Sequence, residues 1–138
     1  MTALSTKHRP IRYHVRAPVD LAALGKLREA AWGGKDDGSW WKPVLERSLT
    51  WVTAYDGAAL VGFVNVAWDG GVHAFLLDTT VHPSWQRRGL GTQLVRRAAE
   101  AAQTGDVEWL HVDFEPHLTD FYAGCGFQST AAGLLRLK

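Results

Sequence analysis

A glycine- and arginine-rich bend is the part of this sequence best suited to hold a charged ligand. Residues 86–91 read Gln-Arg-Arg-Gly-Leu-Gly, between an extended stretch and a helical pattern. A helix N-terminus leaves about four backbone N–H groups unpaired and carries roughly half a positive charge. Gly89 and Gly91 would leave those groups open to an anion, and Arg87 and Arg88 add mobile positive charge. The bend is therefore predicted to bind a phosphate group.

Two well-known phosphate loops do not fit this bend. The dinucleotide fingerprint requires a third glycine where Leu94 stands, and the P-loop requires Gly-Lys followed by Ser or Thr, a triplet that the sequence lacks. A plain strand-to-helix turn with solvated arginines is the alternative interpretation. For an isolated Gly-x-Gly that alternative stays open.

Strands and helices are expected to surround the bend as a mixed α/β arrangement. Turn signals at Asp56-Gly57 and at 69–71 separate three strands of an antiparallel meander. The third of these strands, 73–81, has an apolar centre that predicts burial on both faces. A later strand, 107–114, follows a strand–helix crossover and is predicted to lie parallel to 73–81. The full set of expected strands is 11–16, 50–55, 60–68, 73–81, 107–114 and 134–137.

Four helices are expected between these strands. The first follows an Asp20 cap, with Leu21, Leu24 and Leu27 on one stripe. The second is short and covers 41–48. The third begins at Leu90 and ends at Gly105, and the fourth lies within 118–127.

Composition bounds the class of protein. The chain has 138 residues, of which 46% are hydrophobic and 21% charged, as in one soluble domain; we expect a flexible N-terminus over 1–8 and the domain over 9–138. A net charge of +1 argues against nucleic acid as a partner, and no run of about 18 apolar residues suggests a membrane span. Cys125 is the sole cysteine and the N-terminus has no signal-like apolar run, so the cytoplasm is the expected location.

Two motifs, in order, resemble the GNAT-type N-acetyltransferase superfamily. The superfamily's first signature is Gln/Arg-x-x-Gly-x-Gly/Ala after a strand often ending in Val-x-Pro, which matches Val81-His82-Pro83 and 86–91. The second is Phe-Tyr-x-x-x-Gly-Phe, which matches 121–127. The resemblance covers roughly 9–138. It implies a single-domain GNAT-like fold, with a mixed sheet splayed at its centre and flanked by helices.

The resemblance also implies an acyltransferase that uses acetyl-coenzyme A (acetyl-CoA) as cosubstrate and transfers its acetyl group directly to a primary amine. Tyr122 matches the family's general acid toward the coenzyme thiolate, and a phenol of pKa about 10 can donate that proton. Asp78 stands where relatives often carry an acidic residue, so it is the first candidate for the base. The cofactor-binding residues implied are Thr79, Val81, Gln86, Arg87, Arg88, Gly89, Leu90, Gly91 and Thr92.

The general base and the acceptor are left open by the sequence. His111 and Asp113 share a strand face and Glu115 follows, where many relatives carry Asn; two ligands in a His-x-Asp pair are too few for a metal, so none is predicted. The acceptor is expected to be a small-molecule or peptide amine, on a side shaped by 31–47. The tryptophans there could wall a pocket for an apolar or cationic group, or simply pack. An exposed edge strand would also permit a homodimer.

A non-catalytic sensor or scaffold that binds acyl-CoA is the alternative function. It would keep the phosphate-binding bend and lack productive chemistry. The presence of Tyr122 favours the enzyme over the sensor.

Overall fold

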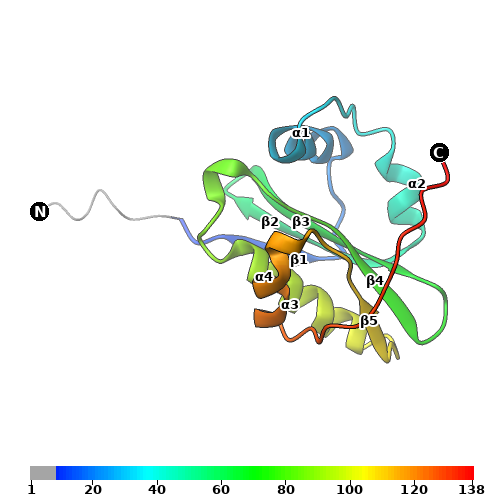
Figure 1. The fold of residues 1–138 in the computed structure, drawn as a ribbon. Helices are drawn as coiled ribbons and strands as arrows, with labels where there is room; N and C mark the ends of the chain where they lie inside the picture. Colours follow the sequence, from blue (N-terminus) through cyan, green and yellow to red (C-terminus); the bar gives the residue numbers. More distant parts are fainter. Residues whose placement is uncertain (1–8) are drawn as a thin grey trace, which may run out of the picture.

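A five-stranded sheet forms the centre of the molecule (Figure 1). The computed structural model describes residues 9–138, and the flexible N-terminus expected over 1–8 lies outside them. Strand order follows the chain, β1-β2-β3-β4-β5. The first four strands pair antiparallel, and β4 pairs with β5 in parallel, as predicted from the crossover. The strands are β1 (Arg12–Val15), β2 (Ser48–Asp56), β3 (Ala59–Trp68), β4 (His73–Val81) and β5 (Trp109–His111).

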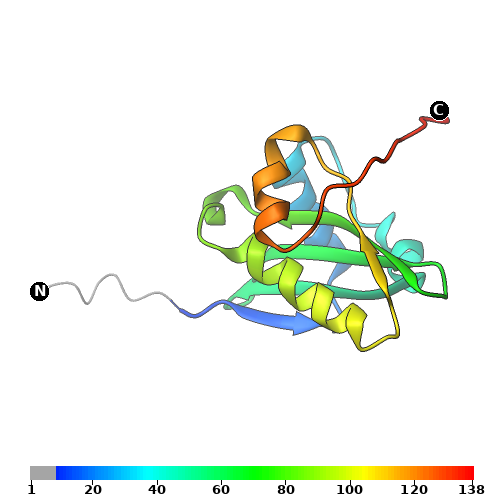
Figure 2. The same cartoon turned by 60° about the horizontal axis from the view of Figure 1, so that its bottom comes forward.

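Helices cover both faces of this sheet, as Figures 1 and 2 show. Helix α3 (Leu90–Gln103) lies across one face and α4 (Thr119–Gly124) sits beside it, while α1 (Leu21–Trp32) and α2 (Trp41–Glu46) lie on the other. Two short 3-10 turns, η2 (Pro83–Trp85) and η3 (Pro116–Leu118), precede α3 and α4. The molecule is thus a single-domain mixed α/β fold with three layers.

Each face of the sheet has its own hydrophobic core. Under α3, a large cluster joins the buried helix residues Leu90, Leu94 and Ala98 to Val64 and Leu76 of the sheet. Under α1 and α2, a smaller cluster gathers Leu24, Leu27, Trp41, Leu45 and Phe63. The Asp20 carboxylate accepts N–H groups of α1's first turn, so the predicted cap is confirmed.

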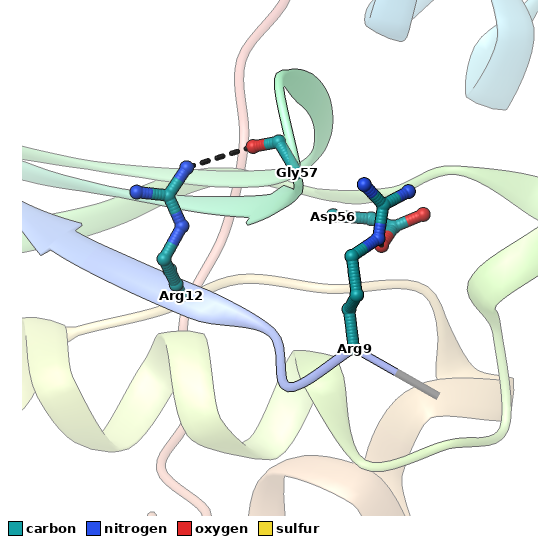
Figure 3. Close-up of polar contacts among 4 residues, drawn as sticks. All are labelled: Arg9, Arg12, Asp56 and Gly57. Atoms are coloured by element: carbon teal, nitrogen blue, oxygen red, sulfur yellow. Dashed lines mark hydrogen bonds and ion pairs between the residues drawn. The ribbon is translucent and has the colours of Figure 1, made fainter. Parts of the chain in front are cut away.

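Two arginines tie the start of β1 to the β2–β3 hairpin (Figure 3). Arg12 donates from Nη2 to the Gly57 carbonyl oxygen at 2.8 Å. The Arg9 side chain forms an ion pair with Asp56 at 3.3 Å. The turn predicted at Asp56-Gly57 therefore also anchors the edge strand.

Three sequence expectations are wrong. No strand forms at 134–137: the leucines there are 84–85% exposed and the segment after Phe127 packs against nothing described. The strand expected over 107–114 shrinks to β5. Strand β4 is buried on one face only, because Ala74 and Leu76 point into the core while Phe75 and Leu77 are each 38% exposed.

In the described part of the chain, no helix is long and apolar enough to span a bilayer.

Candidate active site

The sheet opens between β4 and β5. Parallel pairing joins only His73–Phe75 to Trp109–His111, yet β4 continues to Val81. Within residues 9–138, the second half of β4 therefore has β3 as a neighbour on one side and no strand on the other. A register shift against β3 falls in the same region, and Asp78 has a left-handed φ of 59°. This bulge redirects side chains at the mouth of the gap.

The predicted phosphate bend lies where β4 gives way to α3. Gly89 caps the helix with φ 83°, a conformation that side-chain-bearing residues rarely adopt, and no other part of the described chain would meet a Cβ placed there. Arg88 is stacked over the Trp85 ring at 4.8 Å, whereas Arg87 is exposed. The helix N-terminus is therefore open to an anion, with guanidinium groups beside it.

Other residues of the bend support its shape. Gln86 donates from Nε2 to the Val81 carbonyl oxygen at 3.3 Å, which closes the loop. Leu90 is only 4% exposed, so its side chain belongs to the core and only its backbone can face a ligand. A Cβ on Gly91 would lie 3.2 Å from the Phe121 ring, so glycine there also lets α4 pack close to α3. Thr92 is half-buried in the first turn of α3.

Tyr122 faces the same gap from α4. Its hydroxyl donates to Thr79 Oγ1 at 3.3 Å, and its ring stacks on Phe114 at 4.7 Å. The side chain is 6% exposed, and burial raises the pKa of Tyr122 above its ordinary value. A phenol held protonated beside β4 is a suitable proton donor for a leaving group in the gap.

Asp78 lies close to Asn65 of β3 and Arg28 of α1. Asp78 is exposed as a residue, yet protein atoms crowd its carboxyl, so burial raises its pKa while Arg28 and Asn65 lower it by a smaller amount. Asn65 is 1% exposed; its Oδ1 accepts from Ser48 Oγ at 2.5 Å, and its Nδ2 has no hydrogen-bond partner in the structure. The orphaned amide nitrogen is near enough to influence the Asp78 carboxyl without completing a bond to it.

The other candidate bases are engaged elsewhere. His111 contacts His73, with Nε2 and Nδ1 2.8 Å apart, and Phe75 stacks on the His111 ring. Asp113 lies close enough to Tyr122 to raise the pKa of its phenol, which places it on the side of the proton donor. Glu115 is exposed at the start of η3. Among the acids and histidines predicted, Asp78 is the one that lies at the β4 bulge beside the gap.

A hollow of about 600 Å³ lies on the α1–α2 side of the sheet, and one of its lining residues, Arg28, also lowers the pKa of Asp78. It is lined by Arg28, Lys35, Asp36, Asp37 and Trp40. Of the tryptophans expected to wall a pocket, Trp40 does so, whereas Trp41 is 1% exposed and packs in the core. Trp32 donates from Nε1 to Thr80 Oγ1 at 3.4 Å, beside the second half of β4.

Solved structures share this overall fold. A GNAT-family acetyltransferase from Streptococcus pneumoniae TIGR4 superposes with a TM-score of 0.77 at 25% identity, over 94% of this chain and 100% of that one. The aminoglycoside acetyltransferase AAC(6')-Iy, solved with a bisubstrate analogue of CoA and acetylneamine, superposes with a TM-score of 0.75 at 19% identity, over 94% and 99%. The fold is therefore that of the acetyltransferases.

Sequence comparison identifies the family. The acetyltransferase (GNAT) family model matches residues 21–127. The chain is 31% identical over 87 residues to GCN5-related N-acetyltransferase 1, chloroplastic, of Arabidopsis thaliana, which covers 63% of this chain and 44% of that protein. It spans less than half the length of such curated relatives. The chain belongs to the acetyltransferase (GNAT) family.

Proposed function

We propose that this protein is an N-acetyltransferase that moves the acetyl group of acetyl-CoA directly onto a primary amine of a small molecule or peptide. The observation that carries this proposal is the gap between β4 and β5, with the open helix cap at Gly89 at one end and the Tyr122 hydroxyl at its side. Few other ligands combine a pyrophosphate, an extended amide-bearing arm and a reactive sulfur.

The residues present fit that cosubstrate. The open Gly89 cap and the first N–H groups of α3, with Gln86–Thr92 around them, would hold the pyrophosphate. The backbone of Thr79 and Val81 lies on the part of β4 that has no strand partner toward β5, so it could pair with the amides of the pantetheine arm. Arg87 and Arg88 would add charge-assisted contacts.

When bound, acetyl-CoA supplies the acetyl group and a sulfur leaving group, so that a C–N bond forms as the C–S bond breaks. Tyr122 donates its proton to the departing sulfur. Asp78 accepts the amine proton, directly or through one water, and its raised pKa makes it a stronger base than an ordinary carboxylate. The amine nitrogen thus loses one proton to Asp78, and the leaving sulfur gains one proton from Tyr122.

The test is a screen of primary amines with acetyl-CoA, read out as free thiol and as acetylated product. Amine-dependent thiol release that requires the intact bend would support the enzyme. Tight binding of acetyl-CoA without turnover on any amine would favour the alternative, a non-catalytic acyl-CoA sensor. Absence of coenzyme binding would overturn both.

A further inference from the structure

The segment that follows α4 exposes apolar side chains. Residues 128–138 are all exposed, and Figure 2 shows them leaving the body of the molecule and ending clear of the sheet and its helices. The leucines of this segment are 84–85% exposed: Leu134, Leu135 and Leu137. In an extended chain Leu135 and Leu137 share one face, with Arg136 and Lys138 on the other. Apolar exposure of this kind marks a surface that binds a partner.

The outer edge of β5 is a strand edge without a partner. In the described part of the chain, β5 is the last strand of the sheet and pairs only with β4. The Trp109 N–H donates to the Val72 carbonyl oxygen at 2.9 Å, toward the start of β4. Because successive residues of a strand direct their backbone groups to opposite edges, the N–H and C=O groups of Leu110 face away from β4. This edge can therefore accept a further strand.

The side chains around β5 complement those of the segment. On the face of the sheet opposite α3, Trp109 is 60% exposed and Phe75 of β4 is 38% exposed. Residues 106–115 hold four acids and no Lys or Arg, whereas 128–138 hold two basic residues and no acid. The acids stand before and after β5, so the basic end of an added strand meets negative charge in either direction along the edge.

We propose that residues 128–138 of one copy of this chain add as a strand to the free edge of β5 in a second copy, which returns the same contact. Leu135 and Leu137 then cover Trp109, and the basic residues of each copy meet the acids of the other. Segment and edge lie on the same chain, so one twofold axis completes two identical interfaces. Within one copy the segment is exposed along its whole length, so it does not cover its own β5. The inference goes beyond the proposed function and does not depend on it.

This pairing also accounts for two strand patterns that the single chain does not fulfil. The pattern at 107–114 extends beyond β5 at both ends, and the pattern at 134–137 forms no strand. Both stretches lack a hydrogen-bonded neighbour in the described chain where the pattern fails. Across two copies, each stretch supplies the neighbour that the other requires.

Sedimentation velocity over a range of protein concentrations tests the interface. The wild type should be a dimer that dissociates on dilution. The double variant Leu135→Glu/Leu137→Glu should raise the dissociation constant on the order of 100-fold, because two charges would be buried against Trp109. Both leucines are exposed in the single chain, so the variant should keep the circular dichroism spectrum of the diluted wild type. Val15→Glu, on β1 at the opposite edge of the sheet, is the control and should leave the dimer intact.

Hydrogen exchange followed by NMR identifies the edge that receives the segment. The Leu110 N–H should exchange slowly at concentrations where the dimer is populated and quickly after dilution, with a far larger change than N–H groups in the β2–β3 pairing. A protein that stays monomeric and still protects Leu110 would have its segment on its own β5, which overturns the inference. A dimer that persists at wild-type strength in Leu135→Glu/Leu137→Glu uses another surface and also overturns it. A protein that is monomeric with rapid exchange at Leu110 at every concentration does the same, and in each case the acetyltransferase proposal stands.

Discussion

At the scale of single residues, the proposed reaction requires two proton transfers. Tyr122 is expected to donate a proton to the leaving sulfur, and Asp78 is expected to accept the proton of the amine. Tyr122→Phe keeps the ring that stacks on Phe114 and removes only the hydroxyl that donates to Thr79. Turnover should fall on the order of 100-fold, as for loss of a general acid, while calorimetry shows little change in CoA affinity. Tyr55→Phe, at the β1–β2 pairing, is the matched control. Unimpaired turnover in Tyr122→Phe would remove it from the mechanism.

Asn65 should set the pKa of Asp78, which accepts the amine proton in the proposed reaction. Its unpartnered Nδ2 lowers the pKa of Asp78, so Asn65→Leu should raise that pKa and move the acidic limb of the kcat profile to higher pH. Thr50→Val is the control, because it also changes a buried polar group with no partner. The acidic limb of the kcat profile of Thr50→Val should stay at the wild-type pH. A limb that fails to move in Asn65→Leu would contradict Asp78 as the titrating base.

The raised pKa of Asp78 also carries a cost in stability with a definite sign. The folded chain binds this proton more tightly than the unfolded chain, so protonation of Asp78 stabilises the fold. This stabilisation is fully present below the pKa of Asp78 in the unfolded chain and is lost as pH rises through its pKa in the folded chain. Asp78→Asn, which tolerates the left-handed φ, should gain stability relative to wild type between pH 4 and pH 7. Urea unfolding at the two pH values measures the difference. A difference independent of pH would show that the carboxyl is not buried in solution.

At the scale of elements, the cap of α3 is expected to bind the coenzyme pyrophosphate, and a matched pair of variants separates the effect of charge from that of shape. Gly89→Asn and Gly89→Asp place nearly identical side chains at φ 83°, which Asn and Asp tolerate better than other side-chain-bearing residues. The aspartate should abolish CoA binding by repelling the pyrophosphate, while the asparagine weakens it less. Calorimetry on both proteins gives the ratio. Equal affinities would place the pyrophosphate elsewhere.

Local patterns predicted some elements well and others poorly. The stretch at 73–81, apolar at its centre and preceded by a turn signal at 69–71, matches β4 residue for residue, because both signals are local in the sequence; only its predicted burial on both faces is wrong. The leucines at 134–137 have the same kind of pattern and form no strand. A strand needs a partner with a free edge, and the periodicity of one segment carries no information about that partner.

The residues of the candidate site divide in the same way, into those indicated by local sequence patterns and those that depend on contacts between distant elements. Gly89 and Tyr122 could be proposed from the sequence because the two matched motifs contain them, and Asp78 because relatives often carry an acidic residue at its position. Arg28 and Asn65 were missed, since their roles arise from neighbours on other elements. A signal was nevertheless present: Arg28 continues the stripe of Leu24 at i+4, and Asn65 is a polar residue within an apolar strand. A polar group on a buried face requires a partner, and here that partner is Asp78 or a ligand.

At the scale of the whole molecule, a hydrophobic core lies on each face of the sheet that contains the gap. The cluster under α3 fixes Leu76 and the helix cap, while the smaller cluster under α1 fixes the helix that carries Arg28. Helices α3 and α1 lie on opposite faces of the sheet (Figure 2). In the proposed reaction, a coenzyme at the cap of α3 and an acceptor on the α1 side would reach β4 from different faces, and their reactive groups would meet near the bulge at Asp78.

Hydrogen exchange tests whether this gap is filled as an added strand would fill it. Backbone N–H groups of Leu77–Val81 that face away from β3 have no strand partner in the described chain and should exchange quickly in the free protein. Saturating CoA should slow them far more than amides in the β2–β3 pairing, whose slowing reports only the global gain of about 2.7 kcal/mol expected at 100 times Kd. Equal slowing of both regions would mean that the ligand stabilises the fold without pairing with β4. If the strong local slowing of hydrogen exchange persists in Tyr122→Phe and disappears in Gly89→Asp, Gly89 is needed for coenzyme binding and Tyr122 is not.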